Sequence, residues 1–340
     1  MEIKSTEMPA LKPPEGVIPN FDNPPSIHYV HNAVAISALT VSAVAVAART
    51  YARAKVMKKF DLNDCALILS LAVMSAYVAL TITTGHYGQG VHQWNVPLSR
   101  FSYLLRLMNY IEILYGPLMF FAKYVVLRQI ESIFLQHRFH SFSHRGLITL
   151  IWLNFIFYAG WMFSFILACI PREKIWNPTV KGQCINVDAA LISSSAINIL
   201  SDITILILPL AAIRSLQMAR KSKIKITAIF AVGSFAIAAS IVRFVYTIEL
   251  SKTKDITYRI EPFAYWTEIE YATVVLVACF PVFPLLFRHI IGESKQVFSS
   301  RGKTSLFGSS RPQTDKELDQ SSVTNLRGHA GHELEENSGW

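Results

Sequence analysis

Hydrophobic residues gather in seven long stretches, separated by shorter segments that are polar or basic. The stretches lie at about residues 29–48, 62–84, 103–127, 147–170, 187–210, 226–249 and 266–287. A helix needs roughly 20 mostly apolar residues to cross the hydrocarbon core of a bilayer. The pattern therefore predicts an all-α membrane protein, with a bundle of seven transmembrane helices at residues 29–290.

Composition supports this class and limits the partners. Hydrophobic residues make up 52% of the chain, charged residues 16%, and the mean hydropathy is +0.34, which is too apolar for an ordinary soluble domain. The formal net charge of +9 could indicate a nucleic-acid-binding protein. Its placement argues against that class, because the loops after the first, third and fifth stretches hold 13 Lys and Arg, and the other three hold 7.

Loops rich in Lys and Arg face the cytoplasm by the positive-inside rule. The N-terminus is therefore expected outside and the C-terminus in the cytoplasm, with the basic loops against anionic membrane lipid and no nucleic acid as partner. Residues 1–28 would form an extracellular segment without a cleavable signal peptide. Residues 291–340, rich in Ser, Gly, Lys and Glu, would form a disordered cytoplasmic tail. We expect a multi-pass protein of the plasma membrane.

The fifth stretch, Asn186 to Arg214, carries a polar stripe. At about 100° per residue, Asp188, Ser195, Asn198 and Asp202 share one sector of a helix. A carboxylate that faces lipid is costly, so the stripe should face other helices or water. Two interpretations stay open for the stripe by itself: contacts between helices, or the wall of a binding or reaction cavity.

Depth in the membrane divides the polar residues into two groups. Arg243 lies ~9 Å below the outer end of its helix. The groups expected in the outer half are predicted to bind a ligand, and they are Arg106, Asn109, Glu112, Asp188, Arg243, Glu268 and Glu270. Asp202 lies deeper, where Lys123 or Asp64 could neutralise it. The residues predicted to make structural polar contacts there are Lys123, Asn198, Asp202 and Asp64, so the stripe should divide rather than form one continuous site.

The cysteines also divide by depth. Cys169 and Cys184 both fall on the outer side, where oxidation is permitted, and are predicted to form a disulfide. Cys65 and Cys279 are expected to stay reduced. His86 and His92 lie in an outer turn without further ligands, so we expect a polar or aromatic contact there and no metal site.

Nine segments, spread over roughly residues 30–290, have a characteristic order and spacing. They are RTYARAKVMKKFDLNDCALIL, TTGHYGQGVH, FFAKYVVLRQIESIF, IWNPTVKGQCIN, NILSDITILILPLAAIRSLQM, KSKIKI, SIVRF, WTEIE and ACFPVFPLLFR. Together they resemble the fungal rhodopsin-domain family of seven-helix membrane proteins. The resemblance implies a likeness to G-protein-coupled receptors and, for many members, a place in a secondary-metabolite gene cluster.

Retinal is not expected despite the family's name. A retinal Schiff base needs a lysine amine within the bundle, and residues 263–287 contain none. Lys123 lies near the cytoplasmic end of its stretch. We therefore expect no cofactor.

Two functions remain as hypotheses. The first is a receptor-like sensor of a small or hydrophobic molecule, with a cytoplasmic signalling protein as its partner. The alternative is a membrane-embedded enzyme or accessory protein of a fungal secondary-metabolite pathway, in which buried carboxylates near an arginine perform acid–base chemistry. No phosphate-binding loop, zinc-protease helix or serine-nucleophile motif assigns a reaction class, so the sequence leaves open whether the protein is an enzyme.

Overall fold

The computed structural model describes residues 8–135, 141–214, 220–286 and 288–289, all within the compact unit formed by residues 1–292. The predicted cytoplasmic tail, residues 291–340, lies outside the described residues. Seven helices in the described part are long and apolar enough to cross a membrane, so the predicted seven-helix class is confirmed.

The connections between the long helices differ in length, and the longer ones contain short elements of their own. The helices are α1 (His28–Tyr51), α2 (Leu62–His86), α3 (Leu98–Leu135), α4 (Ser141–Ile166), α5 (Val187–Arg214), α6 (Arg220–Ser251) and α7 (Ile256–Cys279). A π-helical turn, η1 (Ala52–Val56), extends α1, and three 3₁₀ turns lie at η2 (Gln93–Asn95), η3 (Arg172–Ile175) and η4 (Phe280–Val282). Two short antiparallel strands, β1 (Cys169–Ile170) and β2 (Gln183–Cys184), join α4 to α5.

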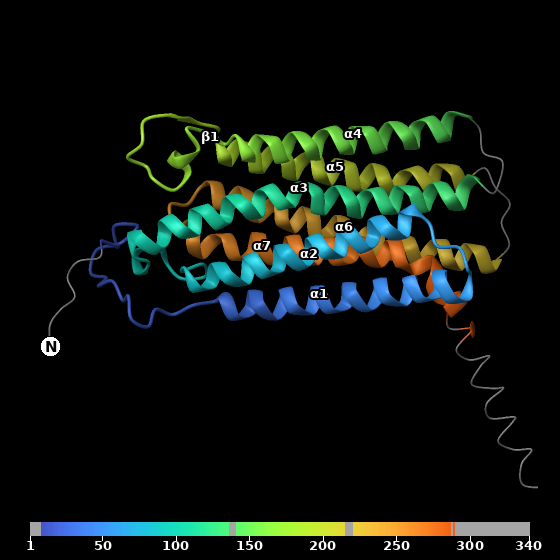
Figure 1. Cartoon of the computed structure of the whole chain (residues 1–340), viewed down its shortest axis with the longest axis horizontal. Helices are drawn as coiled ribbons and strands as arrows, with labels where there is room; N and C mark the ends of the chain where they lie inside the picture. Colours follow the sequence, from blue (N-terminus) through green and yellow to red (C-terminus); the bar gives the residue numbers. More distant parts are fainter. Residues whose placement is uncertain (1–7, 136–140, 215–219, 287, 290–340) are drawn as a thin grey trace, which may run out of the picture. The chain divides into compact units, whose positions relative to one another are not determined.

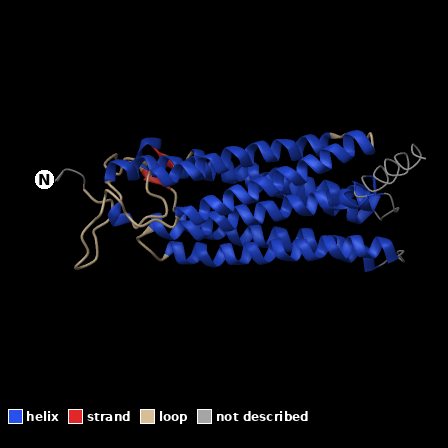
Figure 2. Cartoon of the chain, turned by 90° about the horizontal axis from the view of Figure 1, so that it is seen from below, coloured by secondary structure: helices blue, strands red, loops and turns tan. Residues whose placement is uncertain are grey.

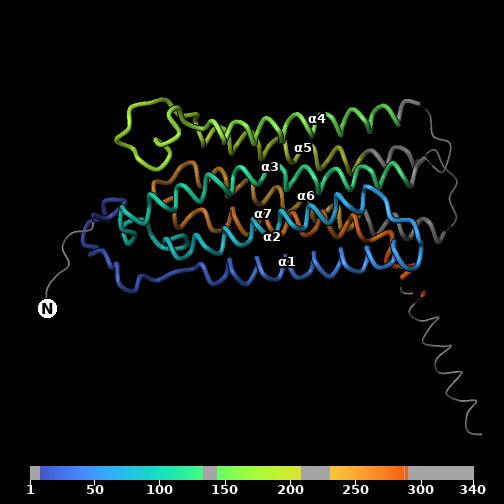
Figure 3. Tube along the Cα trace, in the orientation of Figure 1, coloured from blue at the N-terminus to red at the C-terminus, as the bar shows by residue number. Residues whose placement is uncertain are grey.

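Helices α3 and α7 form the centre of the bundle. Buried residues make up 56% of the apolar stretch of α3 and 50% of that of α7, but at most 33% in the other five helices. In Figure 1, α1 runs along one edge of the bundle and α4 along the other, with α3 and α7 between them. The Cα trace in Figure 3 follows the same order. Polar side chains on α3 and α7 can therefore meet partners from several helices.

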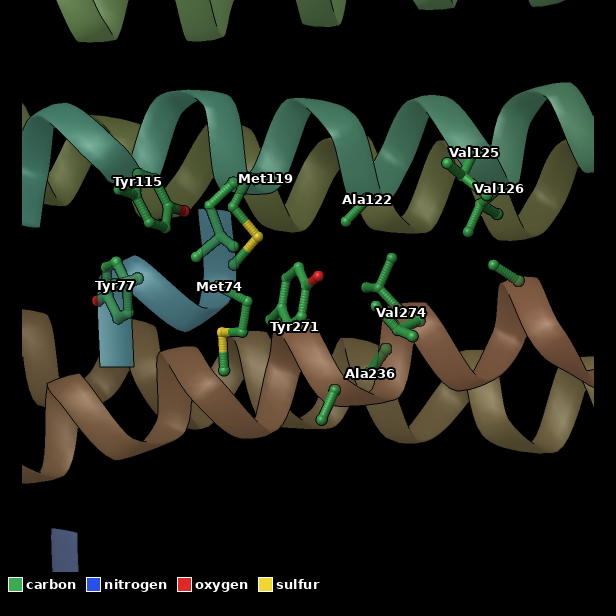
Figure 4. Close-up of a cluster of buried hydrophobic side chains, with 14 of the residues drawn as sticks. Met74, Tyr77, Tyr115, Met119, Ala122, Val125, Val126, Ala236, Tyr271 and Val274 are labelled. Atoms are coloured by element: carbon green, nitrogen blue, oxygen red, sulfur yellow. The ribbon is translucent and has the colours of Figure 1, made fainter. Parts of the chain in front are cut away.

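The core between these helices is packed from apolar and aromatic side chains. Figure 4 shows Met119 and Ala122 of α3 pointing toward Tyr271 and Val274 of α7, with Met74 of α2 beside them. The buried Tyr271 hydroxyl lies 2.9 Å from the Ser70 hydroxyl, which satisfies its hydrogen-bonding capacity.

Helices α3 and α4 approach each other closely at Gly116. A Cβ atom at this position would lie 2.8 Å from the carbonyl oxygen of Tyr158. Pro117 follows within the same helix. The glycine is therefore required by the close backbone approach rather than by its own backbone angles.

One end of the bundle carries the disulfide, and we call it the disulfide end; the strands mark it in Figure 2. Cys169 and Cys184 are bonded, as predicted, whereas Cys65 and Cys279 are free. The N-terminal segment pairs with the α2–α3 connection through backbone bridges between Pro9 and Pro97 and between Ser26 and Val91. Residues far apart in sequence thus cover this end together.

His92 lies in that covering layer and makes the aromatic contact expected for it. Its ring stacks on Trp94 at 4.3 Å and on Tyr258 at 4.1 Å between centroids. Its Nδ1 lies 2.6 Å from Asp255 Oδ2, just before α7. This histidine connects the α2–α3 connection to the start of α7.

Candidate functional site

An ion pair between α6 and α7 lies deep in the bundle. Arg243 Nε donates to Glu270 Oε2 at 2.8 Å, and the two residues are 1% and 0% exposed. Arg243 Nη1 also donates to the Ser195 hydroxyl of α5 at 3.2 Å. Two isolated buried charges would each cost several kcal/mol, so the pairing is a condition for placing either group here.

Asn198 of α5 connects this ion pair to a second acidic group. Its side-chain amide donates to Glu270 Oε1 at 2.6 Å and to Asp202 Oδ2 at 3.2 Å. Its side-chain oxygen accepts a hydrogen bond of 2.7 Å from the Tyr158 hydroxyl of α4. One fully buried amide therefore contacts both carboxylates.

A second ion pair holds the Asp202 side of the network. Lys123 Nζ of α3 lies 2.8 Å from Asp202 Oδ1 and donates to the Asn198 carbonyl oxygen at 3.2 Å. The Ser240 hydroxyl of α6 donates to Asp202 Oδ2 at 2.7 Å. We call Lys123, Asp202, Asn198, Glu270 and Arg243 the buried network. The predicted contact of Asp202 with Lys123 is confirmed, but the predicted separation of this contact from the Arg243 cluster is wrong, because the Asn198 amide donates to both Glu270 and Asp202.

Other residues of the predicted ligand-binding group lie elsewhere. Asp188 is exposed in the first turn of α5, where its charge suits the helix dipole, and makes no ion pair in the described chain. Arg106 stacks on Trp176, with its guanidinium carbon 4.3 Å from the ring centroid. Asn109 donates to the Phe165 carbonyl oxygen at 2.9 Å. The prediction that Arg106 and Asp188 join Arg243 is therefore wrong.

Glu112 is partly exposed within the bundle, and its carboxylate makes no hydrogen bond or ion pair in the described chain. Its backbone carbonyl accepts a 3.0 Å hydrogen bond from Trp161 Nε1. The role of Glu112 as a ligand-binding residue stays a prediction.

Glu268 belongs to a separate polar cluster among α1, α2 and α7. Its Oε1 accepts from the Thr81 hydroxyl at 3.2 Å and lies 3.5 Å from His31 Nε2. Glu261 lies 2.7 Å from His28 Nδ1 and 3.3 Å from His31 Nδ1. The sequence analysis missed His28, His31 and Glu261. The spacings of three residues between the histidines and seven between the glutamates put each pair on one helix face, which is the signal that could have found them.

Asp64 pairs with Arg49 rather than with Lys123 or Asp202. Arg49 Nε donates to Asp64 Oδ1 at 3.0 Å, and Nη1 donates to Gln129 Oε1 and to the Ala278 carbonyl oxygen. Asp64 also completes a capping box with Asp61 at the start of α2. Arg49, counted as a loop charge from the sequence, is a fully buried residue of α1 that contacts three other helices.

Two hollows adjoin these groups. A cavity of about 70 Å³ lies beside Lys123 and Asp202 and is otherwise mostly apolar, with Phe230 and Val274 in its wall. A wider cleft of about 520 Å³ lies at the disulfide end, between the first turns of α3 and the loop that carries Trp176. Among the described residues, no group of three or more His, Cys, Asp or Glu has an arrangement that could hold a metal ion.

The fold and the buried network define a polytopic helical membrane protein whose largely apolar interior contains closely paired charged and polar side chains. Comparison with known families identifies the particular family. The fungal rhodopsin domain matches residues 48–289, so the chain belongs to the fungal rhodopsin-domain family.

Several curated relatives are similar to this chain. A SAT4 family membrane protein of Emericella nidulans is 34% identical over 266 residues, which cover 77% of this chain and 67% of that protein. A fugralins biosynthesis cluster protein of Gibberella zeae is 25% identical, over 85% of this chain and 74% of its own length. A polyenoic acids biosynthesis gene cluster protein of Metarhizium anisopliae is 23% identical, over 72% and 70%. No solved structure matches the chain.

Proposed function

We propose that this protein is a receptor-like sensor of a small molecule, and that the buried network is the element whose arrangement changes on binding. The observation that carries the proposal is the position of Asn198, which contacts the carboxylates of both ion pairs. Movement of α7 relative to α5 must alter the Asn198–Glu270 hydrogen bond. Movement of α6 must alter the Arg243–Glu270 ion pair or the Ser240–Asp202 hydrogen bond. Because packed polar networks change between discrete arrangements rather than continuously, such a network suits a two-state transmitter.

The proposal includes an orientation and a location. We place the disulfide end outside the cell, in the plasma membrane, with membrane lipid around the bundle and a cytoplasmic signalling protein at the opposite end. The loop disulfide and the excess of basic residues in the alternate loops support this orientation. Ligand would then arrive at the disulfide end, above Arg243 and Glu270.

The test compares strains of the native host that carry the gene deletion, the wild-type gene, Glu270→Gln or the control Ser193→Ala. Ser193 is exposed on α5 and bonds only within its own helix. We expect Glu270→Gln to reproduce the transcriptional changes of the deletion while the protein remains in the membrane, and Ser193→Ala to behave as wild type. Wild-type transcription in the Glu270→Gln strain would contradict the proposed role of the network.

The second candidate is a membrane-embedded enzyme or accessory protein of a secondary-metabolite pathway. The observation that favours it is the naming of the Gibberella zeae and Metarhizium anisopliae relatives after biosynthesis clusters. Glu112, whose carboxylate is unpaired in the described chain, would be its candidate acid or base. Metabolite profiles of the same strains separate the two functions, because an enzyme's loss leaves its precursor to accumulate, and a sensor's loss lowers pathway products without an accumulating intermediate.

A further inference from the structure

The cleft at the disulfide end combines apolar and aromatic walls with one cationic side chain and three neutral polar residues, Ser102, Asn177 and Thr179. Leu98 and Tyr103 of α3 form one side, Trp176 and Pro178 of the α4–α5 loop form the other, and Arg106 lies between them. No Asp or Glu lines the cleft. Its volume of about 520 Å³ falls within the range of roughly 300–1,000 Å³ that small-molecule sites occupy.

Arg106 differs from the buried basic residues of the bundle. Arg49, Lys123 and Arg243 each pair with a carboxylate, whereas Arg106 makes no ion pair in the described ranges. Its Nε is buried and has no hydrogen-bond partner. The guanidinium lies over the Trp176 ring at 4.3 Å and near the Tyr103 ring at 5.9 Å, which holds the planar group without neutralising its charge. The chemistry of the cleft therefore favours an anion.

The loop wall is held in place before any ligand arrives. The Cys169–Cys184 disulfide closes the loop, and Lys174 Nζ donates to the Gly182 carbonyl oxygen. The Trp176 backbone amide donates to the Glu173 carbonyl oxygen at 3.2 Å. A rigid wall lowers the ordering cost of binding.

We propose that this cleft binds the carboxylate end of a small molecule with an apolar or aromatic body. The carboxylate pairs with Arg106, and the body packs against Trp176, Tyr103 and Leu98. A guanidinium offers two parallel N–H donors that match a carboxylate, and charge-assisted bonds of this kind are the stronger class. The inference rests on the proposed sensor function in naming its ligand class, but the binding itself is measurable without any signalling.

The test uses the full chain in phosphatidylcholine nanodiscs, with naphthalene-1-acetate as the probe and its uncharged amide as the matched neutral compound. Equilibrium dialysis against empty nanodiscs removes the contribution of lipid. We expect saturable binding of the acid, with a Kd about tenfold or more below that of the amide, because a hydrogen bond to a charged group contributes about 1.5–3 kcal/mol.

Variants locate the site. Arg106→Gln should abolish the preference for the acid, and Arg106→Lys, which keeps the charge without the planar fork, should retain part of it. Trp176→Leu should weaken the acid and the amide together. Arg100→Gln is the control, because Arg100 is exposed on the same helix and does not line the cleft. An intact disulfide and an unchanged thermal midpoint verify folding, and Arg106→Lys serves as the test if Arg106→Gln does not fold.

Three outcomes would overturn the inference. The first is the absence of saturable acid binding up to about 1 mM, which is the weak end of specific affinity. The second is equal binding of the acid and the amide. The third is an Arg106→Gln protein that keeps the preference for the acid. A further arm adds phosphatidylglycerol to the nanodiscs: unchanged acid binding supports a free carboxylate ligand, and its loss assigns the cleft to an anionic lipid headgroup instead. Acid binding together with a wild-type response of Glu270→Gln would leave this site standing while the sensor function fails.

Discussion

Glu268 and Glu270 are two residues apart on α7, and their side chains lie on opposite faces of that helix. Glu270 pairs with Arg243 of α6 at 2.8 Å, whereas Glu268 accepts from Thr81 of α2 and lies 3.5 Å from His31 of α1. Two residues correspond to about 200° of helix rotation, so equal depth in the membrane does not bring both carboxylates to one site. The body of α7 therefore separates the buried network from the polar cluster around Glu268.

Removal of both members of the central ion pair should cost less stability than the two single removals added together. Glu270→Gln leaves Arg243 buried without its counterion, and breaking such a pair costs about 3–5 kcal/mol. The double variant Glu270→Gln, Arg243→Gln should lose less than the sum of the two single variants. Thermal unfolding of the full chain in detergent measures this, and strictly additive losses would contradict the pairing.

Asn198→Leu should destabilise the protein more than Asn154→Leu does. Asn198 contacts both Glu270 and Asp202, while Asn154 of α4 accepts only from Ser201 and donates within its own helix. Loss of the Asn198 amide leaves two buried carboxylates short of a donor, at about 1–3 kcal/mol or more. Thermal midpoints of the two variants, measured under the same conditions, check this. Equal losses would show that the Asn198 bridge contributes no more to stability than the hydrogen bonds of Asn154 do.

Two helical glycines should respond oppositely to alanine. Gly116→Ala places a Cβ 2.8 Å from the Tyr158 carbonyl oxygen and should push α3 and α4 apart. Gly160 has open space around its Cβ position, so Gly160→Ala should be neutral or stabilising by up to about 1 kcal/mol from helix propensity. Thermal midpoints compare them, and an unharmed Gly116→Ala protein would contradict the close approach.

Cysteine labelling should report the orientation of the bundle. Cys65 is exposed near the start of α2, at the end opposite the disulfide, while Cys279 is buried in α7. With the disulfide end outside, a membrane-impermeant maleimide should label Cys65 only after cells are broken. Cys65→Ser provides the background, and Cys279 should react only after denaturation. Labelling of Cys65 on intact cells would reverse the proposed orientation.

The sequence was sufficient for the seven helices, because a bilayer requires long apolar stretches whatever their neighbours are. Helix ends were less certain: α1 continues through Arg49, whose charge is buried instead of ending the helix. The Cys169–Cys184 bond followed from two cysteines on one side of the membrane.

Residue depth was also readable, since each helix residue advances about 1.5 Å. Depth made Glu270 one of several candidate partners of Arg243, and Lys123 one of two candidates for Asp202, and the structure contains both of these pairs. The direction in which each helix turns its polar face depends on its neighbours, and one sequence does not specify which helices those are. Only the tertiary structure could therefore show that Glu268 lies beside His31 and that Asp64 pairs with Arg49. It also decided that Asp188 is exposed and that the Asn198 amide connects the two expected sites.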